Sequence, residues 1–476
     1  MRILFVRPEP SPDTIGLQHL MVVEPLELEI MATLVKSDHQ VLIADMILDK
    51  RPLKYFIESF RPDVLCLTGY ITHIPVMVNY CTEAKQINPK IQTVVGGVHI
   101  EKFPEDIEHE SVDFRVVRNA TRTFPQLIDF LTSKDDFPLG VLKRGMQLDE
   151  GLLPDYDFFT VVPDRSLTAI YRSQYFYVFH NKVALMKGSF GCPYQCNFCF
   201  CRKITGYKYF ARPMTELVDE LEGIHEKEVY LVDDDFLVST ERVKEFLRLI
   251  KERNIKKKYL VYGRADFIGK NPQLIKEFKE AGLRTVIVGL ESFDDIELTG
   301  FNKQTDSNIN RLAMNVLNKY GVNCYAGVIL SPSWTAADFK RAGDIMLSLG
   351  IMFVNLQPLT PLKGIGINFN EDDLVVSRDD YAKWDLAHVT IRPEHMTVAE
   401  YYRQVLKLYL RILYHPRNLL GVLKYPVHMQ WRMVKGLGKV MKQYKERIMQ
   451  AKEQELLSQT QNLNQKLEKE KTSLEN

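Results

Sequence analysis

The sequence predicts an α/β protein with two parallel sheets in tandem and a helical region behind them. Residues 1–134 alternate short β-rich runs with helical patterns, and the alternation resumes with longer periods over residues 184–370. From residue 371 to 447 the spacing of apolar residues is helical instead. Strand–helix alternation is typical of parallel sheets whose strands are joined by helices. We therefore expect a doubly wound sheet first, a barrel-like sheet second and helices last.

The first region has the pattern of a Rossmann-like domain. Its β-rich runs are RILFV, QVLIA, VLCLTG, TVVGG and FRVVR. In open sheets of this kind ligands bind at the carboxyl ends of the strands, so the loops after VLCLTG and TVVGG are of most interest. Residues 135–183 include the aromatic stretch AIYRSQYFYVF, lack this rhythm, and are predicted to form a linker between domains.

The second region predicts a partial TIM-type barrel of six strand–helix units. Its strand runs are ALMKGSF, EVYLVDD, KYLVYG, RTVIVGLE, NCYAGVIL and MFVNLQP. In such a sheet the chemistry is expected at the carboxyl ends of the strands, where the following loops converge. The helical region follows, and the polar residues 448–476 form a tail that is either an exposed helix or disordered.

Charge and hydropathy exclude several classes of protein. The 62 basic and 61 acidic residues leave a formal charge of +1, so no global field attracts nucleic acid and no nucleic-acid partner is expected. No run approaches the ~20 apolar residues that span a bilayer. The N-terminal MRILFVRPEP has neither an apolar leader core nor a small-residue cleavage site, so we expect a cytoplasmic protein.

Four of the seven cysteines are concentrated in the segment GSFGCPYQCNFCFCRK, directly after the first strand of the second region. Cys192, Cys196 and Cys199 have the spacing C-x3-C-x2-C. Three thiolates can bind three irons of a [4Fe–4S] cluster and leave the fourth iron open to a substrate. The scattered cysteines lie in apolar surroundings and are predicted to be small buried hydrophobic residues: Cys66, Cys81 and Cys324.

A structural zinc site is the alternative for this segment. Zinc takes four ligands, usually supplied as two pairs, and Cys201 could complete the set. However, the sequence has no second C-x2-C pair, and four thiolates within ten residues give a poor tetrahedron. We therefore favour the cluster, and we interpret Cys201 as its neighbour and not as a ligand.

With the aromatic Phe198 before its last cysteine, the motif resembles the signature of the radical S-adenosylmethionine superfamily. The resemblance implies that the open iron binds S-adenosylmethionine and that Phe198 and side chains at further strand ends contact this cofactor. Carboxylates can accept from the ribose hydroxyls or the ammonium group, and a guanidinium can bind the carboxylate, whereas rim salt bridges are the alternative. The strand-end residues concerned are Asp235, Arg264, Glu291 and Ser292. Where family members often have a Gly-rich stretch after the fifth strand, this chain has GVILSPSW, so adenine contacts are not assigned.

A Rossmann-like domain ahead of such a barrel resembles the cobalamin-binding branch of the superfamily. The residues that carry this resemblance are Thr68 at the end of the third strand and the pair Gly96 and Gly97 at the end of the fourth. Glycines there allow the backbone to approach a nucleotide tail closely. The lower-ligand motif D-x-H-x-x-G is absent, and RNATRT replaces the usual G-E-G-E stretch. Cobalamin bound without a protein histidine is therefore expected, and a degenerate domain that binds none is the alternative.

The resemblance implies a methylase that uses a [4Fe–4S] cluster, S-adenosylmethionine and cobalamin to methylate an unactivated carbon of a lipid or another hydrophobic small molecule. The stretch from GRADF to YAKWDLAHVTIRP looks most like methylases of the hopanoid C-3 type. A reducing electron-donor protein is the implied partner, and no catalytic side chain beyond the cluster is assigned. The alternatives are a cyclase or oxidase of the tetrapyrrole type and a non-catalytic cobalamin or redox sensor.

The segment from His428 to Arg447 mixes apolar and basic residues at helical spacing. Such a helix can lie on an anionic membrane, which would suit a lipid substrate and place the protein at the inner face of the membrane. The alternative is a helix docked on the barrel with a solvated basic face. The substrate, the carbon attacked and the oligomeric state do not follow from the sequence.

Overall fold

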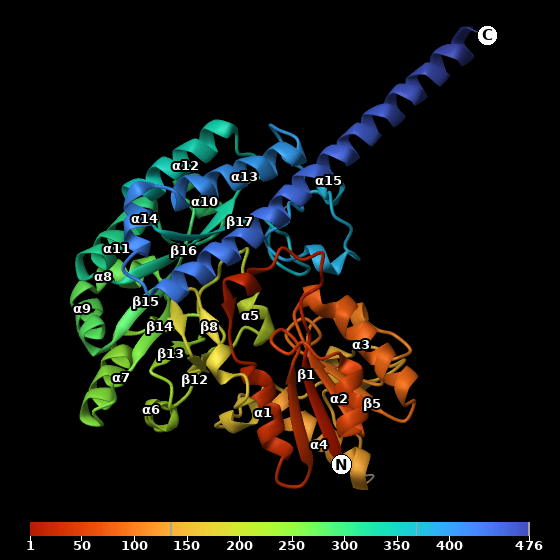
Figure 1. The fold of residues 1–476 in the computed structure, drawn as a ribbon, viewed down its shortest axis with the longest axis vertical. Helices are drawn as coiled ribbons and strands as arrows, with labels where there is room; N and C mark the ends of the chain where they lie inside the picture. The colour runs from red at the N-terminus through yellow and green to blue at the C-terminus, as the bar shows by residue number, and fades with distance from the viewer. Residues whose placement is uncertain (134–135, 368, 475–476) are drawn as a thin grey trace.

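The computed structural model describes residues 1–133, 136–367 and 369–474 and contains two six-stranded sheets, the first built from residues 2–143 and the second from residues 183–358. The N-terminal sheet and its helices form one lobe, and the second sheet with the C-terminal helices forms the other (Figure 1). The α/β fold class predicted from the strand–helix alternation is therefore confirmed. The junction at residues 134 and 135, where the first domain was predicted to end, lies outside the described residues.

The first sheet has the order β3-β1-β4-β5-β6-β7, with β7 antiparallel to β6 and the other neighbours parallel. Alternate residues of its apolar strands enter separate cores on its two faces, as Leu4 and Phe5 do. The strands are β1 (Arg2–Arg7), β3 (Gln40–Asp45), β4 (Val64–Thr68), β5 (Gln92–Gly96), β6 (Phe114–Val116) and β7 (Val141–Lys143). The helices are α1 (Leu26–Val35), α2 (Leu53–Phe60), α3 (Ile74–Ile87) and α4 (Ala120–Ser133).

The segment predicted as a linker contributes strands to two sheets. It supplies β7 to the first sheet, and β8 (Phe176–Tyr177) and β9 (His180–Asn181) form a small antiparallel sheet with β2 (Met21–Val22). Strands of two or three residues leave too short a pattern to be read from the sequence. The small sheet links the N-terminal lobe to the second one, because Tyr177 stacks on Tyr325 of the second sheet at 5.8 Å between ring centroids.

The second sheet runs β10-β13-β14-β15-β16-β17 in chain order with every neighbouring pair parallel. Within the described residues β10 and β17 are not paired, so the six strands form an open, partial barrel. The strands are β10 (Val183–Met186), β13 (Glu228–Leu231), β14 (Lys258–Arg264), β15 (Leu283–Glu291), β16 (Asn323–Leu330) and β17 (Phe353–Pro358). The helices between and after them are α6 (Met214–Gly223), α7 (Thr240–Glu252), α8 (Ala265–Lys270), α9 (Pro272–Ala281), α10 (Asp295–Gly300), α11 (Ser307–Tyr320) and α12 (Ala336–Ser348).

Residue alternation in the second sheet separates an outer core from an inner face. Val229 and Leu231 join the core under the outer helices, whereas Tyr230 between them joins a second group of apolar residues on the concave side. This period of two is that of a strand buried on both faces. The first predicted strand run continues into the short pair β11 (Ser189–Phe190) and β12 (Phe210–Ala211), which encloses the cysteine segment and the short α5 (Cys201–Ile204).

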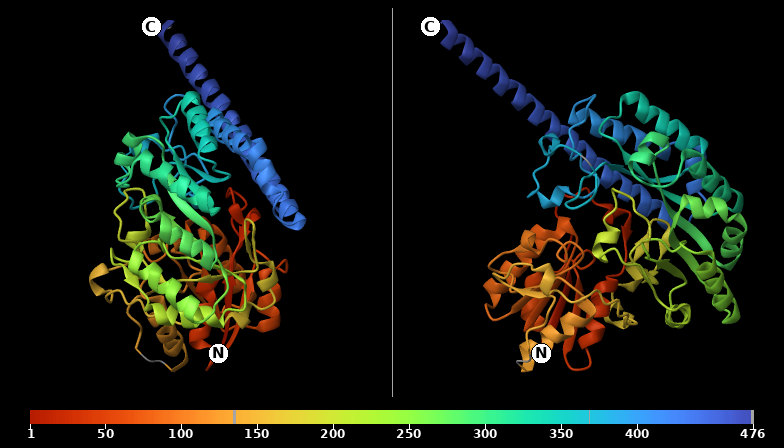
Figure 2. Two further views of the ribbon diagram at one scale, coloured as in Figure 1. Left: turned by 90° about the vertical axis from the view of Figure 1, so that its left-hand side faces the viewer. Right: turned by 180° about the vertical axis from the view of Figure 1, so that it is seen from behind.

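The C-terminal region is helical, as predicted, and its last helix crosses the concave side of the second sheet. Met429 and Met433 pack there with Tyr325, and the helix then extends away from the body (Figures 1 and 2). The polar tail is helical up to Leu474. The helices are α13 (Val398–Leu413), α14 (Pro416–Val422) and α15 (Val427–Leu474). Among the described residues, none of the helices is both long and apolar enough to cross a membrane.

Short 3-10 helices complete the fold. They are η1 (Leu17–His19), η2 (Ile71–His73), η3 (Pro104–Ile107), η4 (Glu150–Leu152), η5 (Arg165–Thr168), η6 (Arg172–Gln174), η7 (Glu371–Asp373) and η8 (Tyr381–Lys383).

Candidate cluster and cofactor site

The cysteine loop is fixed at its start and along its length by backbone contacts. Gly191 has φ +76°, and a Cβ there would lie 2.3 Å from the carbonyl oxygen of Lys208, so only glycine fits. Further along, the amide of Asn197 donates to the carbonyl of Phe301 at 3.0 Å, and its own carbonyl accepts from Gly366 at 2.9 Å. The loop therefore presents its cysteines from a backbone anchored to the chain after α10.

Cys192, Cys196 and Cys199 are all partly buried. Burial raises the pKa of Cys192 to about 12. A hydrogen bond with the Cys201 thiol lowers the pKa of Cys199 to about 7. Burial also raises the pKa of Cys196, while the charges of Lys303 and Arg264 act in the opposite direction. Thiolates are the form that binds iron, so the two cations favour the ligand state of the loop.

Within the described part of the chain, no three His, Cys, Asp or Glu side chains converge on one point that would hold a single ion. The zinc site considered from the sequence needs such a point. A cubane cluster instead takes one thiolate on each of its irons, so its ligands lie on different corners. The loop supplies Cys192, Cys196 and Cys199 from one segment, which suits three corners of such a cluster.

Glu291 lies in an unusual backbone conformation at the end of β15. Its φ is +61°, and the register between β15 and β16 shifts between Gly289 and Glu291. Its carboxylate accepts a hydrogen bond of 2.8 Å from Lys303 Nζ, and both side chains are buried. A non-glycine residue at positive φ costs free energy and is concentrated at functional sites. Desolvation lowers the pKa of Lys303, but the charges of Glu291 and Cys196 raise it to a net value above its usual one.

Arg264 is oriented toward the cysteine loop by three groups. Its Nε donates to Asp266 at 3.0 Å and its Nη2 donates to the carbonyl of Lys303 at 2.8 Å. Its Nη1 lies 3.9 Å from Cys196 Sγ, and the guanidinium stacks 3.8 Å from the ring centroid of Tyr194. The residue is thus beside the predicted cluster, although much of its hydrogen-bonding capacity is already used by the protein.

The aspartates after β13 have different roles. Asp233 accepts from the amide of Gly188 at 2.6 Å and from the hydroxyl of Ser189 at 2.7 Å, so it holds the strand that leads to the cysteines. Asp235 accepts only from the amide of Leu237, and its Oδ2 is buried without a partner among the described residues. Burial raises the pKa of Asp235 to about 7. A buried acceptor without a hydrogen-bond partner costs free energy. The Oδ2 atom of Asp235 is therefore suited to accept a hydrogen bond from a ligand.

Two further predicted residues differ in their placement. Phe198 contacts Phe301 edge to face, with ring centroids 5.5 Å apart, and lies beside the site as expected. Ser292 was predicted to contact the cofactor, but its hydroxyl donates to Glu297 and accepts from the amide of Asp294 at 3.0 Å. These bonds order the turn that starts α10, and Ser292 does not line the cavity.

In the N-terminal lobe, the predicted strand-end residues form one surface at the ends of β4 and β5. Thr68, Gly96 and Gly97 all line the cavity. Gly97 has φ +117°, and a Cβ there would lie 2.7 Å from the carbonyl oxygen of Gly69. The backbones that follow β4 and β5 are therefore in contact at Gly69 and Gly97, without a side chain between them. This surface, which we call the floor of the cavity, is one that a large planar ligand can approach closely.

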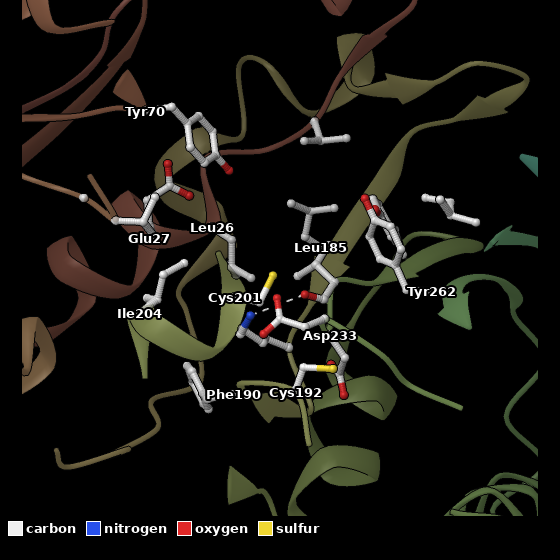
Figure 3. Close-up of a pocket in the computed structure, with 18 of the residues that line it drawn as sticks. Leu26, Glu27, Tyr70, Leu185, Phe190, Cys192, Cys201, Ile204, Asp233 and Tyr262 are labelled. Atoms are coloured by element: carbon white, nitrogen blue, oxygen red, sulfur yellow. Dashed lines mark hydrogen bonds between the residues drawn. The ribbon is translucent and has the colours of Figure 1, made fainter. Parts of the chain in front are cut away.

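A single cavity of about 1210 Å³ joins this floor to the cysteine loop. It is lined by the cysteine triad, by Phe198, Asp235, Arg264, Glu291 and Lys303, and by the strand ends of the N-terminal lobe. Figure 3 shows Tyr70 and Glu27 of the N-terminal lobe facing Cys201 and Asp233 of the second lobe. The structure thus brings together every predicted site residue except Ser292.

Sequence reasoning missed several polar groups of this cavity. Lys303 follows α10 in the segment FNKQT and carries no motif signal, and Glu101 lies in a loop after β5. Burial raises the pKa of Glu101 to about 7 and also raises the pKa of Glu27. The described residues that line the cavity include no histidine.

Comparison with known families assigns both lobes. The model of the radical SAM superfamily matches residues 186–344, and that of the B12 binding domain matches residues 14–128. The B12 binding match contains β3 to β6 of the first sheet, and the radical SAM match contains β13 to β16 of the second. The chain belongs to the cobalamin-binding branch of the radical S-adenosylmethionine superfamily. The cofactors of this radical enzyme are accordingly a [4Fe–4S] cluster, S-adenosylmethionine and cobalamin.

The individual relatives include methylases and cyclases. The chain is 25% identical over 416 residues to the hopanoid C-3 methylase of Methylococcus capsulatus, which covers 86% of this chain and 79% of that protein. It is 23% identical over 377 residues to an anaerobic magnesium-protoporphyrin IX monomethyl ester cyclase of Rubrivivax gelatinosus, covering 75% and 66%. The chain is thus a cobalamin-dependent radical enzyme of the methylase type.

Among solved structures, the radical S-adenosylmethionine methyltransferase TsrM from Kitasatospora setae, with cobalamin and a [4Fe–4S] cluster bound, is similar along nearly the whole chain. The TM-score is 0.64 at 14% identity, and the match covers 94% of this chain and 99% of that one. At this identity the likeness concerns the fold. It shows that both lobes and the C-terminal helices belong to one known architecture.

Proposed function

We propose that this enzyme methylates an unactivated carbon of a hydrophobic small molecule. The observation that carries the proposal is the single cavity that joins the cysteine loop to the strand ends of the B12 binding domain. Away from the cysteines its wall is apolar and aromatic: Tyr177, Tyr325, Phe353, Met433 and Met441. Ligand sites with apolar walls and a few polar groups select apolar substrates.

The residues of the chain hold and orient what the cavity binds. Cys192, Cys196 and Cys199 would hold the cluster. Asp235 would accept a hydrogen bond from S-adenosylmethionine through its unpartnered Oδ2, and Arg264 would keep positive charge beside the thiolates. Together, the bound cofactors supply the hydrogen abstraction and the methyl group of the reaction. An electron-donor protein would reduce the cluster.

The hopanoid C-3 methylase among the relatives supports a polycyclic lipid as the substrate. A substrate of that class partitions into membranes, so the peripheral membrane contact predicted for residues 428–447 belongs to the same proposal.

Methyl transfer can be tested directly. The anaerobically reconstituted enzyme would receive cobalamin, a strong reductant, S-adenosylmethionine labelled in its methyl group, and a triterpenoid lipid fraction. We expect label in an organic-soluble product, and Cys196→Ala should abolish it. Reductive cleavage of S-adenosylmethionine without label in any organic-soluble product would contradict the proposal.

A cyclase or oxidase of the tetrapyrrole type is the second candidate, because several relatives are magnesium-protoporphyrin ester cyclases. The assay separates the two functions when it is repeated with a magnesium-porphyrin ester in place of the lipid fraction. A cyclase would give an oxidised product without the labelled methyl group, whereas a methylase gives a labelled product heavier by one methylene unit.

A further inference from the structure

The C-terminal helices carry a strong local excess of positive charge. Residues 401–445 contain ten Lys or Arg and no Asp or Glu. The whole chain has a formal charge of +1, so this excess is confined to one region. A region of this kind attracts an anionic surface although the protein as a whole is almost neutral.

The same region exposes a row of large apolar side chains where α14 meets α15. Seven of them have exposed fractions between 46% and 70%. On α15 they are spaced by four and three residues, which places them on one face of the helix. We call this set the α14–α15 corner: Tyr414, Leu419, Leu420, Leu423, Val427, Trp431 and Val434.

The helix α15 is well packed although one of its sides is exposed, because its other side contacts the body of the protein. Met429 and Met433 are buried against the second sheet. Arg432 stacks 3.9 Å from the ring centroid of Phe176 and donates to the carbonyl of Val178 at 2.9 Å. The corner is therefore a fixed part of the surface, because α15 is held in place while the side chains of the corner stay exposed.

Lysines beside the corner are free to meet an external partner. Lys424, Lys435 and Lys439 are exposed and have no ion pair among the described residues. By contrast, Arg411 pairs with Asp344, and Lys442 lies 3.8 Å from Glu446. Lys424 thus lies within the sequence span of the apolar row, Lys435 directly follows it, and Lys439 follows about one helical turn later.

We infer that the α14–α15 corner docks on the surface of a membrane that contains anionic lipids. Helical faces with Trp and Leu side chains and adjacent lysines lie in the interface, with the rings at headgroup level. Protein interfaces are depleted of lysine, so the charge pattern favours lipid over a second copy of the chain. This docking rests on the peripheral membrane contact of the proposed function and deepens it by naming the surface and the lipid class, whereas its test does not require methyl transfer.

The helix α15 carries part of the corner and also forms part of the cavity wall. Met433, Leu437 and Met441 of α15 line the cavity, whereas Val427, Trp431 and Val434 are exposed. A docked enzyme would therefore hold the wall of its cavity against the bilayer.

Vesicle binding tests the inference. The reconstituted full-length enzyme would be floated with phosphatidylcholine vesicles that contain or lack phosphatidylglycerol. Trp431 also provides an internal probe, because it is 70% exposed while the other two tryptophans, Trp334 and Trp384, are buried. We expect binding only to the anionic vesicles, weakened by salt, with a blue shift of the tryptophan emission.

Variants separate the two contributions. The double variant Lys435→Glu, Lys439→Glu should weaken binding to anionic vesicles at least about 25-fold. This estimate assumes that each lysine near the surface contributes about 1 kcal/mol of binding free energy. Leu420→Ser with Leu423→Ser should remove the blue shift. Ile296→Ser, at an apolar side chain on α10 that is even more exposed than Leu420 and Leu423, is the control and should bind as the unmodified enzyme does.

Three results would overturn the inference. Equal binding to vesicles with and without phosphatidylglycerol would show that the lysines do not attract the protein to anionic lipid. Corner variants that bind as tightly as Ile296→Ser would show that the corner is not the contact. A dimer in solution that the corner variants dissociate would assign this face to a second copy of the chain.

Discussion

The Glu291–Lys303 ion pair allows a sharp test of the site geometry. Lys303 Nζ lies 2.8 Å from Glu291 Oε1, and the two side chains are only 8% and 11% exposed. Lys303→Met would leave the carboxylate buried without its partner, which typically costs about 3–5 kcal/mol. Lys340→Met is the matched control, because Lys340 pairs with Asp344 on the surface at 3.2 Å. Losing an exposed pair costs about 0.3–0.5 kcal/mol.

A double-mutant cycle completes this test. Glu291→Gln, Lys303→Met and the double variant would be unfolded in urea as anaerobic apo-proteins. Trp334 reports on the region, since its indole donates to Glu297 at 2.6 Å. We expect the double variant to lose roughly 2 kcal/mol less unfolding free energy than the two single variants lose together. Two results would refute a stabilising interaction between Glu291 and Lys303. One is that the losses of unfolding free energy in the single variants simply add in the double variant. The other is that Lys303→Met loses no more unfolding free energy than Lys340→Met.

Three further predictions concern other parts of the molecule. Gly97→Ala should lower the free energy of unfolding of the N-terminal lobe by about 1–3 kcal/mol in denaturant. The φ of Gly97 is +117°, and a Cβ there would lie 2.7 Å from the carbonyl oxygen of Gly69. Gly96→Ala is the control, because a Cβ at Gly96 meets only ordinary contacts and should be tolerated. Burial raises the pKa of Glu29 to about 8, so the folded chain keeps a proton that the unfolded chain releases. The free energy of unfolding should therefore fall as the pH rises from about 4.5 to 8, and Glu29→Gln should flatten that slope in thermal unfolding; an unchanged slope would contradict the assignment. Asp235→Ala should weaken binding of S-adenosylmethionine to the reconstituted enzyme by roughly tenfold in equilibrium dialysis, and unaltered affinity would leave its Oδ2 without the proposed ligand.

Periodicity in the sequence predicted both sheets because their strands are buried on two faces and stand out as apolar runs. The strands from RILFV to FRVVR became β1 and β3–β6, and the six later runs became the six strands of the partial barrel. The short β7–β9 could not be predicted, because two or three residues show no period. Their place depends on partners far away in the sequence.

The site could be predicted only where local sequence carries the chemistry. The cysteine triad and Asp235 follow strand ends directly, so their meeting in one cavity follows from the parallel sheet. Lys303 lies 12 residues after Glu291, and only the fold after α10 returns it to the carboxylate. Ser292 was misplaced for the opposite reason: it is next to Glu291 in sequence, but its hydroxyl bonds to the α10 turn outside the cavity.

The central claim is that Cys192, Cys196 and Cys199 hold the cluster that cleaves S-adenosylmethionine. Its most direct test is the yield of 5′-deoxyadenosine from anaerobically reconstituted enzyme with a strong reductant, measured together with bound iron. The unmodified enzyme and Cys201→Ala should both retain iron and cleave S-adenosylmethionine, whereas Cys196→Ala should lose both properties. Retention of iron and cleavage in Cys196→Ala, or their absence from the unmodified enzyme, would contradict the account.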